Sequence, residues 1–119
     1  VDGGMWRGGP RPGASMVDAP VTAASGEAEY LTDAFLKCGR RFTLIEFANG
    51  SAVDPPDGVG VIRFGERGLS DPEGLAAARY DAKAGSAYLL RPDGYVAARF
   101  RQPTQSMLET ALARASGES

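Results

Sequence analysis

The clearest pattern in the chain is a pair of strand-like segments near its C-terminal end. Residues 87–91 and 95–100 are rich in apolar and aromatic side chains, and only Pro92, Asp93 and Gly94 separate them. Proline presets the backbone for the first position of a type I turn, and glycine accepts the left-handed conformation that closes a short loop. The pattern therefore predicts a β-hairpin.

Helical spacing marks two further segments. In residues 29–38 the apolar side chains fall on one helical face, and Gly39 follows where a helix usually ends. After Pro103 the apolar residues again recur at helical spacing, and they are Met107, Leu108, Ala111, Leu112 and Ala115. We expect a short helix before residue 39 and an amphipathic helix near the C-terminal end.

The middle of the chain predicts two strands and one more helix. Residues 42–48 and 59–64 are apolar and β-branched, as in strands that are buried on both faces. Residues 49–58 contain two consecutive prolines and fit a loop rather than a helix. Ser70 or Asp71 is expected to cap a helix that has Pro72 in its first turn.

The resulting order is helix, strand, loop, strand, helix, hairpin, helix. It predicts an α/β fold of the thioredoxin-like class, in which a four-stranded mixed sheet carries helices on both faces. In redox-active members paired cysteines follow the first central strand, at a helix N-terminus that lowers the thiol pKa. Here residues 48–51 contain no cysteine, and Gly85 and Ser86 stand where active members carry a proline. The active-site cysteines are therefore absent.

The first 28 residues have a different composition from the rest. Glycines and prolines recur throughout residues 1–28, which predicts a linker or extended leader on the surface of a domain formed by residues 29–119. Trp6 is unusual in such a segment. We expect it to dock on the core or on a neighbouring domain.

Composition narrows the chemistry that the chain can perform. It has 119 residues, a net charge of −2, no histidine and one cysteine, Cys38. Nucleophile systems that need histidine, histidine-ligated metals and a Cys-x-x-Cys redox pair are thereby excluded. The basic residues form no stripe and no apolar stretch reaches about 20 residues, so we expect no nucleic-acid or membrane partner and a cytoplasmic location.

No residue pattern predicts a catalytic, cofactor-binding or metal site in this chain. Gly58-Val59-Gly60 lacks the third glycine of a dinucleotide fingerprint and begins a strand instead of following one. Cys38 lies on the apolar face of the first helix, where a free cysteine usually acts as a small buried hydrophobic side chain. A reactive role for this lone thiol is the alternative.

The predicted hairpin also resembles a known family. Its first strand ends in Arg91-Pro92-Asp93, Gly94 completes the turn, and the second strand contains Val96-Ala97-Ala98-Arg99. This arrangement is similar to the C-terminal domain of flavin-dependent aromatic hydroxylases of the phenol hydroxylase and 3-(3-hydroxyphenyl)propionate hydroxylase type, including polyketide hydroxylases. Residues 11–21 and 39–47 resemble the start and the first central strand of that domain, so the resemblance covers nearly the whole chain.

The resemblance implies a non-catalytic accessory or oligomerisation domain of an FAD- and NAD(P)H-dependent aromatic-ring monooxygenase. FAD and NAD(P)H would bind to the parent protein and not to this chain, which alone would be no enzyme. The partners would be the FAD-binding and substrate domains of the parent chain, or a second copy. The family-motif residues would be structural, and they are Arg91, Pro92, Asp93, Gly94 and Arg99.

Two other functions stay open at this point. The chain could be a free-standing, redox-inactive thioredoxin-like binding protein, and the length of the whole gene product distinguishes that case. It could also be a single-cysteine thiol enzyme, and thiol titration of Cys38 distinguishes that one.

Overall fold

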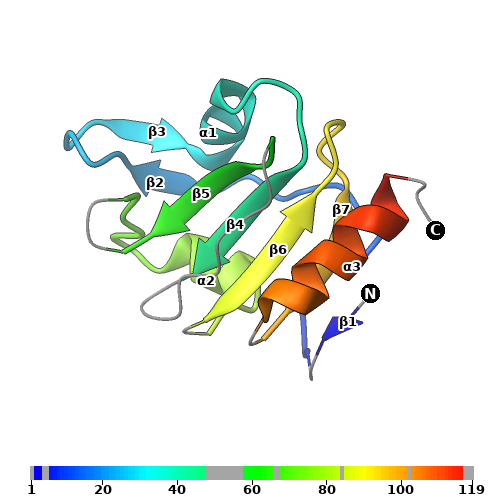
Figure 1. The fold of residues 1–119 in the computed structure, drawn as a ribbon. Coiled ribbons are helices and arrows are strands. Elements are labelled where there is room, and N and C mark those ends of the chain that lie inside the picture. The colour runs from blue at the N-terminus through cyan, green and yellow to red at the C-terminus, as the bar shows by residue number, and fades with distance from the viewer. Residues whose placement is uncertain are drawn as a thin grey trace.

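The computed structural model has four main strands in one mixed sheet (Figure 1). They are β4 (Thr43–Phe47), β5 (Gly60–Phe64), β6 (Ser86–Leu90) and β7 (Val96–Phe100). β4 runs parallel to β5 and antiparallel to β6, and β6 and β7 form an antiparallel pair. The two-residue strand β1 (Asp2–Gly3) extends the sheet beside β7. The order β5-β4-β6-β7 is that of a thioredoxin-like sheet, so the predicted fold class is confirmed.

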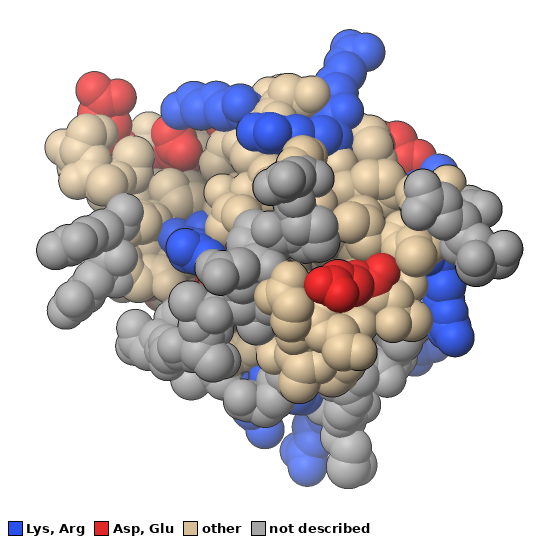
Figure 2. Space-filling model, viewed as in Figure 1, with Lys and Arg blue, Asp and Glu red and all other residues tan. Residues whose placement is uncertain are grey.

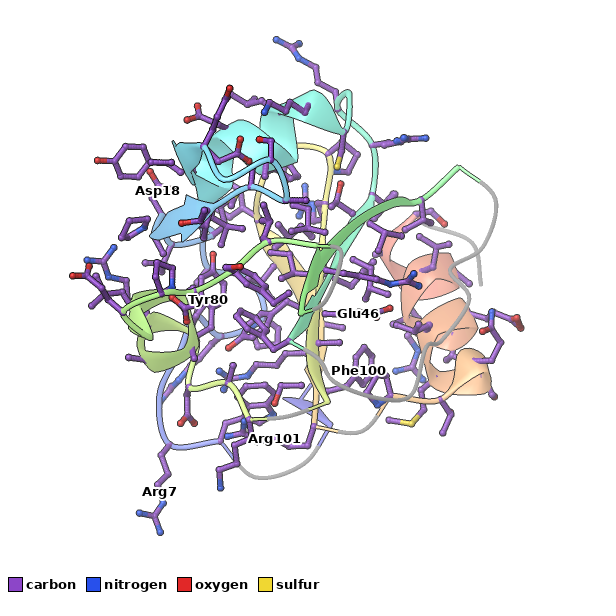
Figure 3. All side chains as sticks on the ribbon, turned by 90° about the vertical axis from the view of Figure 1, so that its left-hand side faces the viewer. Arg7, Asp18, Glu46, Tyr80, Phe100 and Arg101 are labelled. Carbon is purple, nitrogen blue, oxygen red and sulfur yellow. The ribbon has the colours of Figure 1, made fainter. Side chains whose placement is uncertain are left out.

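Helices cover both faces of this sheet (Figures 1 and 3). They are α1 (Leu31–Lys37), α2 (Leu75–Arg79) and α3 (Gln105–Ala115). Successive side chains of a strand point to opposite faces. Ile45 and Tyr88 accordingly belong to the core that α1 and α2 cover, whereas Leu44 and Leu89 pack with Leu108 of α3. The structure describes residues 2–3, 6–47, 58–65, 68–83, 85–101 and 103–116.

Part of the predicted leader contributes to the first of these cores. β2 (Pro20–Thr22) and β3 (Ala28–Tyr30) form an antiparallel ribbon, and Ala19 and Val21 are buried with the side chains of α1. This pairing also explains why α1 begins at Leu31 rather than at residue 29. The domain boundary at residue 28 stays a prediction.

The helix ends follow from local residues. Gly39 directly follows the C-cap of α1 with a φ of +79°, the left-handed conformation that ends many helices. The sequence predicts a cap at Ser70 or Asp71 with Pro72 in the first turn, but α2 begins only at Leu75. The Asp71 carboxylate nevertheless accepts the N–H groups of Ala76 at 3.0 Å and Ala77 at 2.9 Å, so it satisfies the first turn of α2 from a distance.

α3 packs on its sheet face through a narrow apolar stripe. Thr104 caps the helix, because its hydroxyl accepts the N–H of Met107 at 3.2 Å. Leu108 and Ala111 are buried against the sheet. Of the helices that the structure describes, none is long and apolar enough to cross a membrane. Residues 49–57 of the predicted loop lie outside the described residues.

Candidate functional site

The lone thiol sits at the end of α1. Cys38 is the C-cap residue and is partly buried against the core beneath that helix, rather than fully buried as expected. Its sulfur lies 3.6 Å from the carbonyl oxygen of Ala34, within reach of a weak hydrogen bond. Arg41 donates from Nε to the Cys38 carbonyl oxygen at 2.7 Å. Residues 48–51, where an active member carries its paired cysteines, lie outside the described residues.

Titratable side chains do not gather into a ligand set in the part of the chain that the structure describes. Among those residues, no group of three or more His, Cys, Asp or Glu side chains lies close enough to hold a metal ion. Ser86, which replaces the proline of active members, is buried and accepts a hydrogen bond from the Lys83 N–H at 3.0 Å and one from Arg101 at 3.1 Å. Its hydroxyl therefore binds the local backbone and the Arg101 side chain.

The family-motif turn connects β6 and β7. Gly94 has a φ of +86°, and its N–H donates to the Arg91 carbonyl at 2.9 Å. The Asp93 carboxylate accepts the Tyr95 N–H at 3.1 Å and pairs with the Arg91 guanidinium at 2.8 Å. These contacts close the turn and leave the charged ends of Arg91 and Asp93 about half exposed.

Arg99, the last residue of the motif, points into the molecule. Only 3 % of it is exposed, and it donates to the carbonyl oxygens of Gly8 at 2.8 Å and Pro10 at 3.2 Å. Both acceptors belong to residues 6–19, which we call the strap. The strap crosses the sheet face that α1 and α2 leave open over β6 and β7 (Figure 1). An internal arginine of β7 thus binds a segment about 90 residues away in the chain.

Trp6 lies at the start of the strap in a cluster that we call the clamp, formed by Trp6, Tyr88, Arg99, Arg101 and Asp81. The Arg101 guanidinium lies 3.8 Å from the centre of the Trp6 ring, and that of Arg99 lies 4.5 Å from it. Tyr88 meets the same ring edge-on, with centroids 5.3 Å apart. Cation–π contacts of this kind stabilise by about 0.5–2 kcal/mol, more when they are removed from water. Trp6 docks on the core, one of its two expected positions.

The carboxylate of Asp81 supplies the negative charge of the clamp. It accepts the backbone N–H of Arg7 at 2.8 Å and that of Gly8 at 3.2 Å, and it pairs with Arg101 at 2.9 Å. These donors hold the pKa of Asp81 below its ordinary value, the Arg7 N–H contributing most. Arg101 also donates to the Asp81 carbonyl oxygen. Figure 3 shows Arg101 inside this end of the molecule and Arg7 pointing away from it.

Two buried tyrosines continue this polar network behind the clamp. The Tyr80 hydroxyl donates to the carbonyl oxygen of Val17 and accepts the N–H of the same residue at 3.0 Å. The Tyr88 hydroxyl donates to the Tyr80 carbonyl oxygen at 2.6 Å. Burial raises the pKa of both phenols, so both stay neutral donors at physiological pH.

On the opposite sheet face a carboxylate is only half satisfied. Glu46 lies in the middle of β4 with 12 % of its side chain exposed, and its Oε2 pairs with Arg63 of β5 at 3.1 Å. Its other oxygen, Oε1, is buried without a hydrogen-bond partner. Buried oxygens of this kind usually have a partner. The end of β4 leads directly into residues 48–57, which the structure does not describe.

Among the described residues, one shallow groove lies on this face and another lies beside α1 at the β5 edge of the sheet. One, of about 550 Å³, lies between α3 and the start of β4 and is lined by Arg40, Arg41, Phe42, Val59, Glu109 and Leu112 among others. The other, of about 500 Å³, includes Cys38, Arg63 and Leu69. On the α3 side, lysine and arginine side chains lie mostly toward the edges of the molecule (Figure 2). Both grooves are open, unlike the enclosed pockets that usually bind small molecules.

The clamp is the main feature that the sequence did not reveal. Trp6 was the one signal, since a large aromatic side chain is unexpected in a glycine-rich segment. Its partners Arg101 and Asp81 belong to no motif, because they meet Trp6 only once the sheet has formed. Arg99 was assigned to the hairpin motif, and its contacts with the strap lie outside what that motif predicts.

Comparison with known proteins places this domain in a family. The family model described as aromatic-ring hydroxylase, C-terminal, matches residues 9–119. No curated protein sequence matches the chain significantly.

Solved structures give the same result. A ternary complex of aklavinone-11 hydroxylase with FAD and aklavinone is 32 % identical with a TM-score of 0.65, and the match covers 87 % of this chain and 20 % of that one. The flavin-dependent monooxygenase PieE, in complex with FAD and substrate, is 26 % identical with a TM-score of 0.72, over 97 % and 21 % of the two chains. The Diels–Alderase PyrE3 of pyrroindomycin biosynthesis is 27 % identical with a TM-score of 0.55, over 83 % and 17 %. The chain spans about a fifth of these relatives. It belongs to the family of aromatic-ring hydroxylase C-terminal domains.

Proposed function

We propose that the chain is a non-catalytic, C-terminal assembly domain of a cytoplasmic, FAD- and NAD(P)H-dependent aromatic-ring monooxygenase. One observation carries the proposal: the chain corresponds to about a fifth of two enzymes, one solved with FAD and aklavinone and the other with FAD and substrate. The flavin and the aromatic substrate would then bind in the remaining four-fifths of such a parent protein. FAD, NAD(P)H and the catalytic groups belong to those other domains.

The internal chemistry of the domain supports a structural role. Several buried polar side chains that face α1 and α2 bind the strap, as Arg99 does with Gly8 and Tyr80 with Val17. Groups used in this way are not free to activate a substrate. The same domain type occurs in PyrE3, which is described as a Diels–Alderase rather than a hydroxylase. A domain shared by enzymes of different reactions is better suited to assembly than to one chemical step.

The described surface offers apolar side chains for such contacts. Tyr30, Leu36 and Tyr95 are 55 %, 65 % and 44 % exposed, unusually high for large hydrophobic residues. Tyr30 and Leu36 belong to the α1 region, and Tyr95 follows the hairpin turn at the same end of the sheet (Figure 1). Exposed aromatic and aliphatic side chains are enriched at protein interfaces. This end of the domain is our candidate assembly surface.

Deleting residues 1–119 from the parent protein tests the proposal. We expect the remaining domains to lose their native oligomeric state or their hold on FAD, measured by sedimentation and by bound flavin per subunit. The isolated chain should bind no flavin and oxidise no NAD(P)H. Unchanged assembly, flavin content and turnover in the deleted protein would contradict the assembly role.

A surface variant separates assembly from folding. The double substitution Leu36→Ser and Tyr95→Ser should weaken assembly of the parent protein without lowering the unfolding temperature of this domain. Glu109→Ser, also exposed but on α3, is the matched control and should leave the oligomeric state unchanged. If the control and the double variant behave alike, the assembly surface lies elsewhere.

A further inference from the structure

The strap is bonded to the domain along its whole length. The Gly13 N–H donates to the Val96 carbonyl at 2.7 Å, and the Val96 N–H donates to the Ala14 carbonyl at 2.8 Å. The Met16 N–H donates to the Gly94 carbonyl at 2.8 Å. Arg99 binds Gly8 and Pro10 nearer the start of the strap, and Tyr80 binds Val17 nearer its end. Hydrogen bonds to the domain therefore recur every few residues along the strap. A segment held in this way has little of the freedom that its glycines and prolines suggest.

The clamp holds the upstream end of the strap. Trp6 stacks against Arg101 and Arg99, and Asp81 binds two successive backbone N–H groups, those of Arg7 and Gly8. Upstream of the clamp, β1 pairs with Arg99 and Phe100 in the edge of the sheet. Attachment to the domain therefore reaches back to residue 2. Figure 1 shows β1 beside β7 at the edge of the sheet.

We propose that the strap, residues 6–19, acts as a rigid arm that is locked by the clamp and fixes the orientation of this domain on the domain preceding it in the parent hydroxylase. The identity of that partner rests on the proposed function. A flexible linker as long as the strap would let its ends separate by roughly 20 Å in any direction. The bonded arm removes that freedom, so the partner is the part of the parent protein directly upstream of Asp2, held at the sheet edge where β1 pairs with β7.

The isolated chain provides a direct test, because Trp6 is its single tryptophan. We expect Trp6 in the native chain to resist acrylamide quenching and the strap amides, such as that of Gly13, to exchange slowly. Arg101→Met should raise quenching about fivefold or more, as expected for losing a desolvated cation–π contact. Arg114→Met, an exposed arginine in the last turn of α3, is the matched control and should change neither readout.

Far-UV circular dichroism separates loosening of the strap from loss of the fold. If Arg101→Met does not fold, Asp81→Asn replaces it, because asparagine tolerates the positive φ of 48° at this position, keeps one acceptor oxygen and removes the charge. If acrylamide quenches Trp6 in the native chain as strongly as it quenches tryptophan in a free peptide, the proposal of a rigid arm is wrong. Quenching that neither variant changes would overturn the clamp as its lock.

Trypsin tests the arm in the parent protein, since Arg7 is exposed and lies inside the strap. Cleavage after Arg7 should be slow in the native protein and at least about tenfold faster in Arg101→Met, because proteolysis needs local opening. Fast cleavage of the native protein would contradict a rigid arm. If trypsin cleaves the native protein slowly after Arg7 and deletion of residues 1–119 leaves assembly unchanged, the rigid arm is supported and the proposed assembly function is contradicted.

Discussion

Gly94 is the residue on which the turn between β6 and β7 depends. It is buried with a φ of +86°, and a Cβ atom there would lie 3.6 Å from the Phe35 ring and 3.9 Å from Met16. Gly94→Val forces a β-branched side chain into a left-handed conformation, so we expect the free energy of unfolding to fall by about 1–3 kcal/mol. Urea denaturation followed by circular dichroism measures the loss.

Asp93→Ala is the matched variant one position earlier. Its carboxylate is 46 % exposed, and its contacts with Arg91 and the Tyr95 N–H are of a kind that contributes about 0.2–1 kcal/mol in water. The loss should therefore be smaller than for Gly94→Val. Equal and small losses in both variants would mean that the turn does not require glycine.

Asp81 should make the strap sensitive to acid. Its pKa in the folded chain is below the ordinary value of 3.8, first because of the Arg7 N–H and then because of Gly8 and Arg101. A carboxylate of this kind stabilises the folded state above its unfolded pKa, and the contribution disappears as the pH falls through the folded pKa. We expect Trp6 to become more accessible to acrylamide as the pH drops below about 4.

Asp81→Asn provides the control for this pH dependence. Asparagine keeps the shape and one acceptor oxygen but cannot ionise in this range. The variant should show weaker protection of Trp6 at neutral pH and little further change on acidification. If Trp6 in the variant becomes as accessible to acrylamide on acidification as it does in the native chain, other carboxylates cause the pH dependence.

At the scale of elements, α2 depends on a residue outside the helix. Asp71 accepts the Ala76 and Ala77 N–H groups, which have no partner within the helix. Asp71→Ala should lower the free energy of unfolding by about 0.5–2 kcal/mol. Glu73→Ala, two residues later and exposed, should stay within about 0.5 kcal/mol of the native chain. If urea denaturation gives equal values, the Asp71 bonds do not stabilise α2.

The elements that the sequence predicted are those specified by neighbouring residues. The β6–β7 hairpin follows from Pro92-Asp93-Gly94, and α1 and α3 follow from helical spacing, with Gly39 after the one and Pro103 before the other. The ribbon of β2 and β3 was missed, because its three-residue strands are too short for a periodic pattern.

The strap and the clamp were missed for a different reason. The bond between Arg99 and Gly8 joins residues 91 positions apart, and the bond between Tyr80 and Val17 joins residues 63 apart. Such contacts exist only after the sheet has formed, so no local pattern encodes them. Glycines and prolines indicated correctly that residues 6–19 form no helix. They could not indicate that other elements would supply the bonds.

At the scale of the whole molecule, the strap takes the place of a helix. α1 and α2 cover β4 and β5 on one sheet face, and the strap covers β6 and β7 on the same face (Figure 1). Its apolar contribution comes from Trp6, Met16 and Val17, which pack against that core. A segment without regular structure can do this only because side chains such as Arg99 and Tyr80 satisfy its backbone groups. The strap can therefore cover this sheet face only when the internal polar network binds its backbone.

The domain should therefore lose much of its stability when residues 1–28, which include the strap and β2, are removed. A chain of residues 29–119 lacks Trp6, Ala19 and Val21 and exposes the hydroxyl of Tyr80, so we expect a loss of several kcal/mol against a typical total of about 5–15 kcal/mol. A chain of residues 6–119 is the control and should keep most of the native unfolding temperature, because it retains the clamp. Thermal unfolding followed by circular dichroism compares the three chains. If residues 29–119 unfold at the same temperature as the full chain, residue 28 marks the true edge of the domain and the strap only lies on its surface.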